Sequence, residues 1–414
     1  MVVVRPFKAV RPKDELAQKV ASFPYDVINS NEARELAKDD EYSFLHVVKP
    51  EIDLEENINL YDEAVYQKAK ENLYSMIEKK ILVQDEKPLL YIYKQKMGEH
   101  EQYGLVSTVS ADEYNNNIIK KHEFTRKDKE DDRTKHVLTL NANTGPVFLT
   151  YHDNENINKI IESFVKNNTP NVDFVSEDGI GHTVWVINDK NITSKLVELF
   201  KSVEYLYVAD GHHRSASAAR AKAEKMKTDK NYSDDKDYNF FLAVLFPATQ
   251  LKIMDYNRVL FTMNGLTKEQ LFDKIKEKFI FLNENTPKPS SSKRFGMYID
   301  NKWYQIEAKE GSYPSEDPVK SLDVAILQDN LLAPILGIGD PRVDNKIGFV
   351  GGIRGTEELK KRVDSKECAL AFSLFPTDIN QLMDVADVNK VMPPKSTWFE
   401  PKLRSGLFVN LLGE

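Results

Sequence analysis

The stretch EYLYVADGHHR, residues Glu204 to Arg214, runs without a break into SASAARAKAEKM, residues Ser215 to Met226. Its first six residues, rich in tyrosine, leucine and valine, predict a strand. The second stretch holds five alanines, the strongest helix formers, and predicts a helix. A glycine joining a strand to a helix is typical of α/β proteins. We therefore expect an α/β fold of the mixed α+β kind.

Hydrophobic spacing predicts further elements on both sides of this stretch. Strands are expected at 42–48, 89–93, 103–109, 184–187 and 240–246, and helices at 60–80, 157–167 and 191–200. The order of elements changes near residue 88, and a polar, lysine-rich break spans 225–236. These features predict an N-terminal α/β region (1–87), a core that contains the Asp-Gly-His-His-Arg motif (88–236) and a C-terminal α/β region (237–414).

The turn between strand and helix has the chemistry of a phosphate site. Gly211 lets backbone approach a ligand, and the N–H groups of the first helical turn, with the helix dipole, attract anions. His212, His213 and Arg214 add donors, and arginine can bind two phosphate oxygens at once. The alternative is that Asp210 only caps the helix and the histidines are surface residues. A zinc site is a minor alternative, because adjacent side chains on a helix diverge and the motif lacks both an i, i+4 histidine pair and a cysteine partner.

Two further clusters are candidates for anion binding. Residues 120–136 carry seven Lys or Arg against five Asp or Glu, and Glu123 among these cations would stay ionised and available as a base. The alternative is a solvated loop of mixed charge. Residues 393–397, Pro-Pro-Lys-Ser-Thr, offer an ammonium and two hydroxyls, Lys395, Ser396 and Thr397, on a proline-stiffened loop, or else form a structural brace. The glycine-rich turn around Arg354 is a weaker candidate.

Composition excludes several classes of protein. The 414 residues carry 57 Lys or Arg and 65 Asp or Glu, a net charge of −8 that disfavours nucleic acid as a partner. The single cysteine, Cys368, excludes an internal disulfide and every multi-cysteine metal site. No apolar run is long enough for a signal peptide or a membrane span, so a cytoplasmic protein without a membrane partner is expected. P-loop, Rossmann, Gly-x-Ser-x-Gly and His-Glu-x-x-His motifs are missing from the sequence.

Three motifs occur here in the order typical of one family: His122-Glu123, Asp210-Gly-His-His-Arg214 and Pro394-Lys-Ser-Thr397. The chain resembles the free serine kinases of the ParB/sulfiredoxin-like fold, and its length is similar to that of the long branch, the pyrophosphate-dependent serine kinases. The resemblance runs from Arg5-Pro-Phe through Phe23-Pro-Tyr-Asp to Lys402-Leu-Arg-Ser-Gly406. It implies a ParB/sulfiredoxin-like catalytic core with additional N-terminal and C-terminal α/β regions. The sequence departs from that branch at Asn257-Arg258, where the branch tends to have a histidine before the arginine.

The resemblance implies that the chain phosphorylates free L-serine with pyrophosphate as donor and Mg²⁺ as cofactor. Glu123 is then the expected general base and Asp210 a second catalytic carboxylate or metal contact. The implied phosphate-binding residues are Gly211, His212, His213, Arg214, Lys395, Ser396 and Thr397. The implied substrate-binding residues are His122, Thr125, Arg133 and Arg354. The closest alternative uses ADP or ATP as donor. The rival from another class is a non-catalytic ParB-like regulator that binds a nucleotide. The sequence predicts no oligomeric state.

Overall fold

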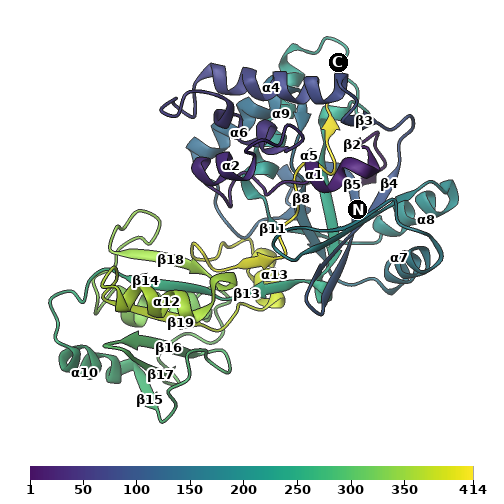
Figure 1. Ribbon diagram of the computed structural model, residues 1–414. Coiled ribbons are helices and arrows are strands. Elements are labelled where there is room, and N and C mark those ends of the chain that lie inside the picture. The colour runs from purple at the N-terminus through teal and green to yellow at the C-terminus, as the bar shows by residue number, and fades with distance from the viewer. Residues whose placement is uncertain (414) are drawn as a thin grey trace. The chain divides into compact units, whose positions relative to one another are not determined.

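The computed structural model describes residues 1–413. The chain packs as two compact units: Met1–Leu251 together with the residues from Pro401 onward, and Lys252–Glu400. The first unit thus contains the regions expected at 1–87 and 88–236, and the end of the chain returns to it. Each unit combines sheet and helices (Figure 1), which confirms the mixed α/β class. The assignment to the ParB/sulfiredoxin-like fold stays a prediction.

The first unit is built on a nine-stranded mixed sheet. The strand order is β6-β11-β8-β12-β5-β4-β10-β9, and β1 pairs with β5. Only β6 with β11 and β8 with β12 run parallel within this sheet. The strands are β1 (Val4–Arg5), β4 (Leu90–Met97), β5 (His100–Ser110), β6 (Ile119–Lys120), β8 (Val147–Tyr151), β9 (Val172–Val175), β10 (Gly181–Ile187), β11 (Leu206–Asp210) and β12 (Phe240–Pro247). Two small pairs accompany the sheet, β2 (Val10–Pro12) with β3 (Leu82–Gln84) and β7 (Ala142–Asn143) with β21 (Asn410–Leu411).

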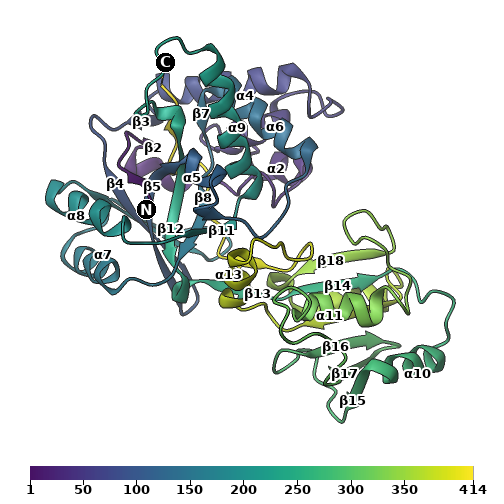
Figure 2. The ribbon, with the colours of Figure 1, turned by 180° about the vertical axis from the view of Figure 1, so that it is seen from behind.

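Helices α4, α6 and α9 lie side by side (Figure 2). In α4, the buried residues Val65, Tyr66, Ala69, Leu73 and Met76 recur at the spacing of one helix face, as the sequence predicts. The helices of this unit are α1 (Ala17–Val20), α2 (Ser30–Leu36), α3 (Leu45–Val48), α4 (Glu63–Glu78), α5 (Ala111–Asn115), α6 (Lys127–Leu140), α7 (Glu155–Asn167), α8 (Lys190–Phe200) and α9 (His212–Thr228).

Two expectations for the first unit are wrong. Residues 42–48 form no strand: Leu45–Val48 is the short helix α3, begun where the Leu45 N–H donates to the Ser43 hydroxyl. Because most of this short segment is buried, with only Tyr42 and His46 partly exposed, its apolar run does not distinguish a strand from a helix. Residues 240–246 do form a strand, but β12 does not open a C-terminal region. It lies between β5 and β8 in the first unit's sheet.

The second unit contains a six-stranded antiparallel sheet in the order β15-β17-β16-β19-β14-β18 and the separate pair β13-β20. The strands are β13 (Lys252–Met254), β14 (Tyr256–Leu260), β15 (Phe279–Leu282), β16 (Arg294–Ile299), β17 (Lys302–Ala308), β18 (Ile347–Gly351), β19 (Leu370–Leu374) and β20 (Trp398–Glu400). The helices are α10 (Lys268–Lys278), α11 (Asp323–Leu327), α12 (Gly355–Asp364) and α13 (Ile379–Asp387).

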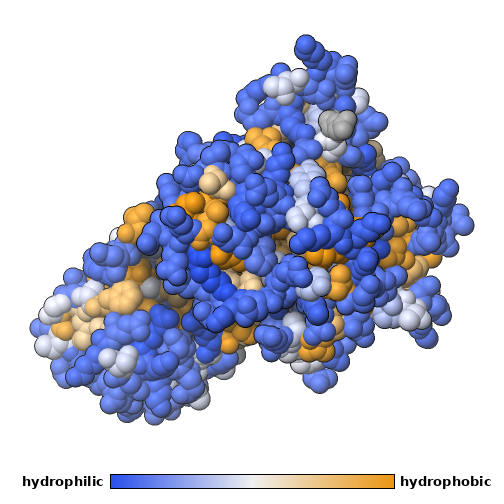
Figure 3. Space-filling model, turned by 45° about the horizontal axis from the view of Figure 1, so that its top comes forward, coloured by the Kyte–Doolittle hydropathy of each residue, from blue (hydrophilic) through white to orange (hydrophobic). Residues whose placement is uncertain are grey.

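Hydrophilic residues predominate on the face drawn in Figure 3. Among residues 1–413, no helix has both the length and the apolar character needed to cross a membrane.

Candidate functional site

The turn from β11 to α9 is built around a left-handed glycine. Asp210 ends β11, Gly211 follows with φ +98°, and α9 begins at His212 and continues for 17 residues. A Cβ on residue 211 would lie 3.1 Å from Nε of Arg214, so a side chain would crowd the guanidinium as well as strain the backbone. The first N–H groups of the helix therefore emerge beside Arg214, at the positive end of the helix dipole.

Two cations meet at the carboxylate of Asp210. Nζ of Lys402 lies 3.2 Å from one oxygen and a terminal nitrogen of Arg214 lies 3.7 Å from the other. Burial raises the pKa of Asp210, but these two cations outweigh burial and hold it well below the usual range. Lys402 is held in turn, because the side chain of Gln95 donates to its backbone carbonyl at 2.9 Å. Asp210 is therefore an ionised anchor that orients both cations.

Lys402 was not predicted as a site residue, although it stands in one of the segments that carry the family resemblance. It lies 192 positions from Asp210 in the chain, in the segment that returns to the first unit. No local pattern marks a lysine for such a contact. The available signal was that Lys402 opens the segment Lys402-Leu-Arg-Ser-Gly406, which carries part of the family resemblance.

The guanidinium of Arg214 is fixed from several sides. It donates to the carbonyl of Pro146 and lies 3.7 Å from a carboxylate oxygen of Asp26. Its Nε is buried and makes no hydrogen bond within the described part of the chain. Asp26 belongs to the Phe23-Pro-Tyr-Asp loop, so this loop contacts the Asp-Gly-His-His-Arg motif. That contact could not be decided from sequence.

Strand β6 brings His122 and Glu123 close to His212, the first residue of α9. Ile119 and Lys120 pair in parallel with Leu206 and Tyr207 of β11, so the residues that follow the two strands lie at one edge of the sheet. The rings of His122 and His212 meet edge to face, with centroids 4.5 Å apart. The ligand atoms of His122, Glu123 and His212 all lie within 4.8 Å of one another.

The two histidines are uncharged at neutral pH. Burial lowers the pKa of His122 to about 4, and burial together with the neighbouring His122 lowers the pKa of His212 well below its usual value. Burial also lowers the pKa of His213, and its Nε2 accepts a hydrogen bond from the backbone N–H of Arg126 at 3.1 Å. When neutral, His213 therefore carries its proton on Nδ1.

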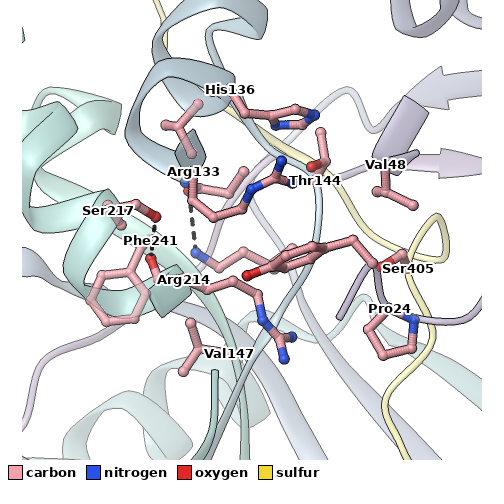
Figure 4. Close-up of a pocket in the computed structure, with 16 residues that line it drawn as sticks. Pro24, Val48, Arg133, His136, Thr144, Val147, Arg214, Ser217, Phe241 and Ser405 are labelled. Carbon is pink, nitrogen blue, oxygen red and sulfur yellow. Dashed lines mark hydrogen bonds between the residues drawn. The ribbon is translucent and has the colours of Figure 1, made fainter. Parts of the chain in front are cut away.

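A pocket adjoins the motif (Figure 4). Arg133 of α6 and Arg214 of α9 both line it, together with Tyr25, His136 and Thr144. The guanidinium of Arg133 lies 4.2 Å from the centroid of the Tyr25 ring and binds the carboxylate of Asp132 at 2.7 Å. Nε2 of His136 lies 3.2 Å from the carbonyl of Val47, and burial lowers the pKa of this histidine to about 3, so it is neutral at pH 7. The pocket therefore presents two oriented guanidinium groups among largely neutral walls.

The other predicted residues fall into two groups. Thr125 lies in the first unit, where its hydroxyl donates to Glu130 at 2.8 Å. Lys395, Ser396, Thr397 and Arg354 belong to the second unit. There the Lys395 ammonium lies 5.6 Å from the centroid of the Tyr256 ring, and the buried Ser396 hydroxyl donates to the carbonyl of Pro393 at 2.6 Å. The hydroxyl of Ser396 thus stabilises its own loop, and the ligand-binding roles of these residues stay predictions.

Magnesium was expected at Asp210. Mg²⁺ binds through one or two carboxylates together with substrate phosphates and keeps several waters. Asp210 supplies one carboxylate, and Lys402 and Arg214 already lie against it. The residues here therefore fit magnesium that arrives with a phosphate ligand and do not form a magnesium cage of their own.

Comparison with solved structures finds weak similarities. One is to a free serine kinase in complex with AMP, at 12% identity and a TM-score of 0.34, covering 71% of this chain and 86% of that chain. Another is to SbnI with a C-terminal truncation from Staphylococcus aureus, at 14% identity and a TM-score of 0.36, covering 74% and 87%. No curated protein matches the chain. The family model DUF1015, described as a protein of unknown function, matches residues 4–325, which is more than half of the chain, and the chain therefore belongs to the DUF1015 family.

Proposed function

We propose that this chain transfers a phosphoryl group from pyrophosphate to the hydroxyl of free L-serine, giving O-phospho-L-serine and orthophosphate. The observation that carries the proposal is the β11–α9 turn, where a helix N-terminus, Arg214 and Lys402 converge around Gly211 and Asp210. Phosphoryl transfer depends mainly on positioning and on stabilising the charge of the transferring oxygens. Fixed cations beside a helix N-terminus are suited to that task.

The donor would bind at this turn. Pyrophosphate carries several negative charges, and the N–H groups of His212, His213 and Arg214 with the two cations offer donors from more than one direction. Magnesium would enter with pyrophosphate and take Asp210 as its protein oxygen ligand. Lys395, Ser396 and Thr397 remain proposed as further phosphate-binding residues.

The acceptor would lie on the side of Glu123. This carboxylate is close to His212 at the helix N-terminus, where it can accept the serine proton as the new O–P bond forms. The bond from phosphorus to the bridging oxygen breaks, and orthophosphate leaves with that electron pair. Arg133, which lines the same pocket as Arg214, would bind the serine carboxylate, because a guanidinium matches a carboxylate with two hydrogen bonds. His122, Thr125 and Arg354 are proposed substrate contacts.

A donor screen tests the proposal. The full chain is incubated with L-serine, Mg²⁺ and either pyrophosphate, ADP or ATP, and O-phosphoserine is measured by mass spectrometry alongside orthophosphate. We expect phosphoserine with pyrophosphate, one orthophosphate per phosphoserine, and loss of product in Glu123→Gln. Product only with ADP or ATP would reassign the donor. The absence of phosphoserine with every donor would overturn the function, and nucleotide-dependent DNA retardation in its place would favour the regulator.

A further inference from the structure

His122, Glu123 and His212 gather three donor atoms of a kind that binds metals. His122 and Glu123 follow β6 and His212 opens α9, and the parallel pairing of β6 with β11 holds these segments together. Their ligand atoms lie within 4.8 Å of one another. In a tetrahedral site with bonds of about 2.0–2.1 Å, donor atoms lie about 3.4 Å apart. Side-chain rotations that shorten these separations by up to about 1.4 Å would bring the three donor atoms onto one ion.

The two imidazoles are buried, and three of their four ring nitrogens have no hydrogen-bond partner among the described residues. His122 is 2% exposed and His212 is 6% exposed. Both ring nitrogens of His122 and Nε2 of His212 make no hydrogen bond in the part of the chain that the structure describes. Buried polar groups nearly always have a partner, and each one left unpaired costs about 1–3 kcal/mol. Unpaired nitrogens on two facing rings therefore point to a ligand between them.

The donor set selects the class of that ligand. Two imidazole nitrogens and one carboxylate oxygen suit Zn²⁺, Mn²⁺, Fe²⁺ and Co²⁺, whereas Mg²⁺ and Ca²⁺ prefer oxygen alone. Two histidines and a glutamate also leave a position on the metal open for water or substrate. We infer that His122, Glu123 and His212 form a site for one divalent first-row transition metal. This site differs in residues and chemistry from the magnesium contact proposed at Asp210.

The inference does not depend on the proposed phosphoryl transfer, because metal binding is measured without substrate. The two proposals are also compatible. A carboxylate bound to the metal through one oxygen leaves the other oxygen of Glu123 to accept a proton.

Cobalt binding tests the site. The full chain is treated with a chelator, dialysed and titrated with Co²⁺, whose visible absorption reports coordination, and Zn²⁺ competes for the same ion site. We expect one Co²⁺ per chain, displaced by Zn²⁺ and retained in a large excess of Mg²⁺. His122→Gln and His212→Gln should each raise the Kd at least about tenfold, since each removes a ligand, while the exposed His152→Gln should bind as the parent does.

Controls keep the result interpretable. Circular dichroism shows whether each variant is folded, and Glu123→Gln, changed at the most exposed of the three positions, serves if a histidine variant does not fold. Absence of Co²⁺ binding by the parent, or binding that survives all three substitutions in folded protein, would overturn the inference. Metal binding without phosphoserine formation would refute only the proposed function, and phosphoserine formation without metal binding would refute only this site.

Discussion

Replacing Gly211 by alanine should damage phosphate binding more than it damages the fold. At φ +98° an alanine pays about 1 kcal/mol or more in backbone strain. Its Cβ would also lie 3.1 Å from Nε and 3.2 Å from Cζ of Arg214. That spacing is tight enough to move the guanidinium, which Asp26 and Pro146 otherwise hold in place.

The magnitude follows from the contact that is disturbed. A hydrogen bond to a charged group contributes about 1.5–3 kcal/mol, so losing one between Arg214 and a phosphate oxygen weakens binding about 10- to 150-fold. We therefore expect the Kd for pyrophosphate, measured by calorimetry, to rise at least about tenfold in Gly211→Ala. The free energy of unfolding, measured by urea titration, should fall by about 1–2 kcal/mol.

Gly98→Ala is the matched control. Gly98 also has a positive φ, +60°, in the turn between β4 and β5, but a Cβ there would meet nothing within 4 Å. It should lose a similar free energy of unfolding and keep the parent's pyrophosphate affinity. Equal pyrophosphate affinity in the two variants would refute the argument that Gly211 keeps space for Arg214 at a phosphate site.

Three further outcomes are expected. Glu123→Gln should fold normally and lose at least about 10²-fold in turnover, the usual contribution of a positioned base; turnover within a few-fold of the parent would remove Glu123 from that role. Arg214→Ala should raise the KM for pyrophosphate more than the KM for serine in steady-state kinetics. An effect confined to the KM for serine would show that the turn does not bind pyrophosphate. Burial raises the pKa of Glu113 from 4.5 to about 7, so the folded state keeps a proton that the unfolded state has lost, and stability falls as pH rises from about 4.5 to above 7. Glu113→Gln has no carboxyl group to ionise, so its free energy of unfolding relative to the parent should rise by up to about 3 kcal/mol between pH 4.5 and pH 8 in urea titrations. A difference between the two proteins that does not change with pH would contradict the raised pKa of Glu113.

Local pattern was informative wherever one face of an element is buried. Helices α4, α7, α8 and α9 all fall close to their predicted ranges, because apolar residues at the helical period or a run of alanines leave little choice. The prediction of a strand at 42–48 failed because most of this short segment is buried, so it shows no hydrophobic period that separates a helix from a strand.

The proposed metal ligands illustrate the limit of sequence reasoning at the site. The prediction against zinc compared His212 with its neighbour His213, whose side chains diverge as expected of adjacent helical residues. The structure instead sets His212 against His122, 90 positions earlier. The parallel pairing of β6 with β11 brings the two histidines into contact, and neither segment's sequence predicts which strands are neighbours in the sheet.

The sequence by itself determined the strand, the glycine turn and the helix that present Asp210 to Arg214, because each depends on the preferences of a few consecutive residues. The tertiary structure alone decided that Lys402 meets Asp210, that Asp26 meets Arg214 and that β12 joins the first unit's sheet. The physical reason is the distance along the chain over which each kind of interaction acts. Backbone preferences act over a few residues, whereas these contacts join segments far apart in the chain and form only where burial of the whole core makes them favourable.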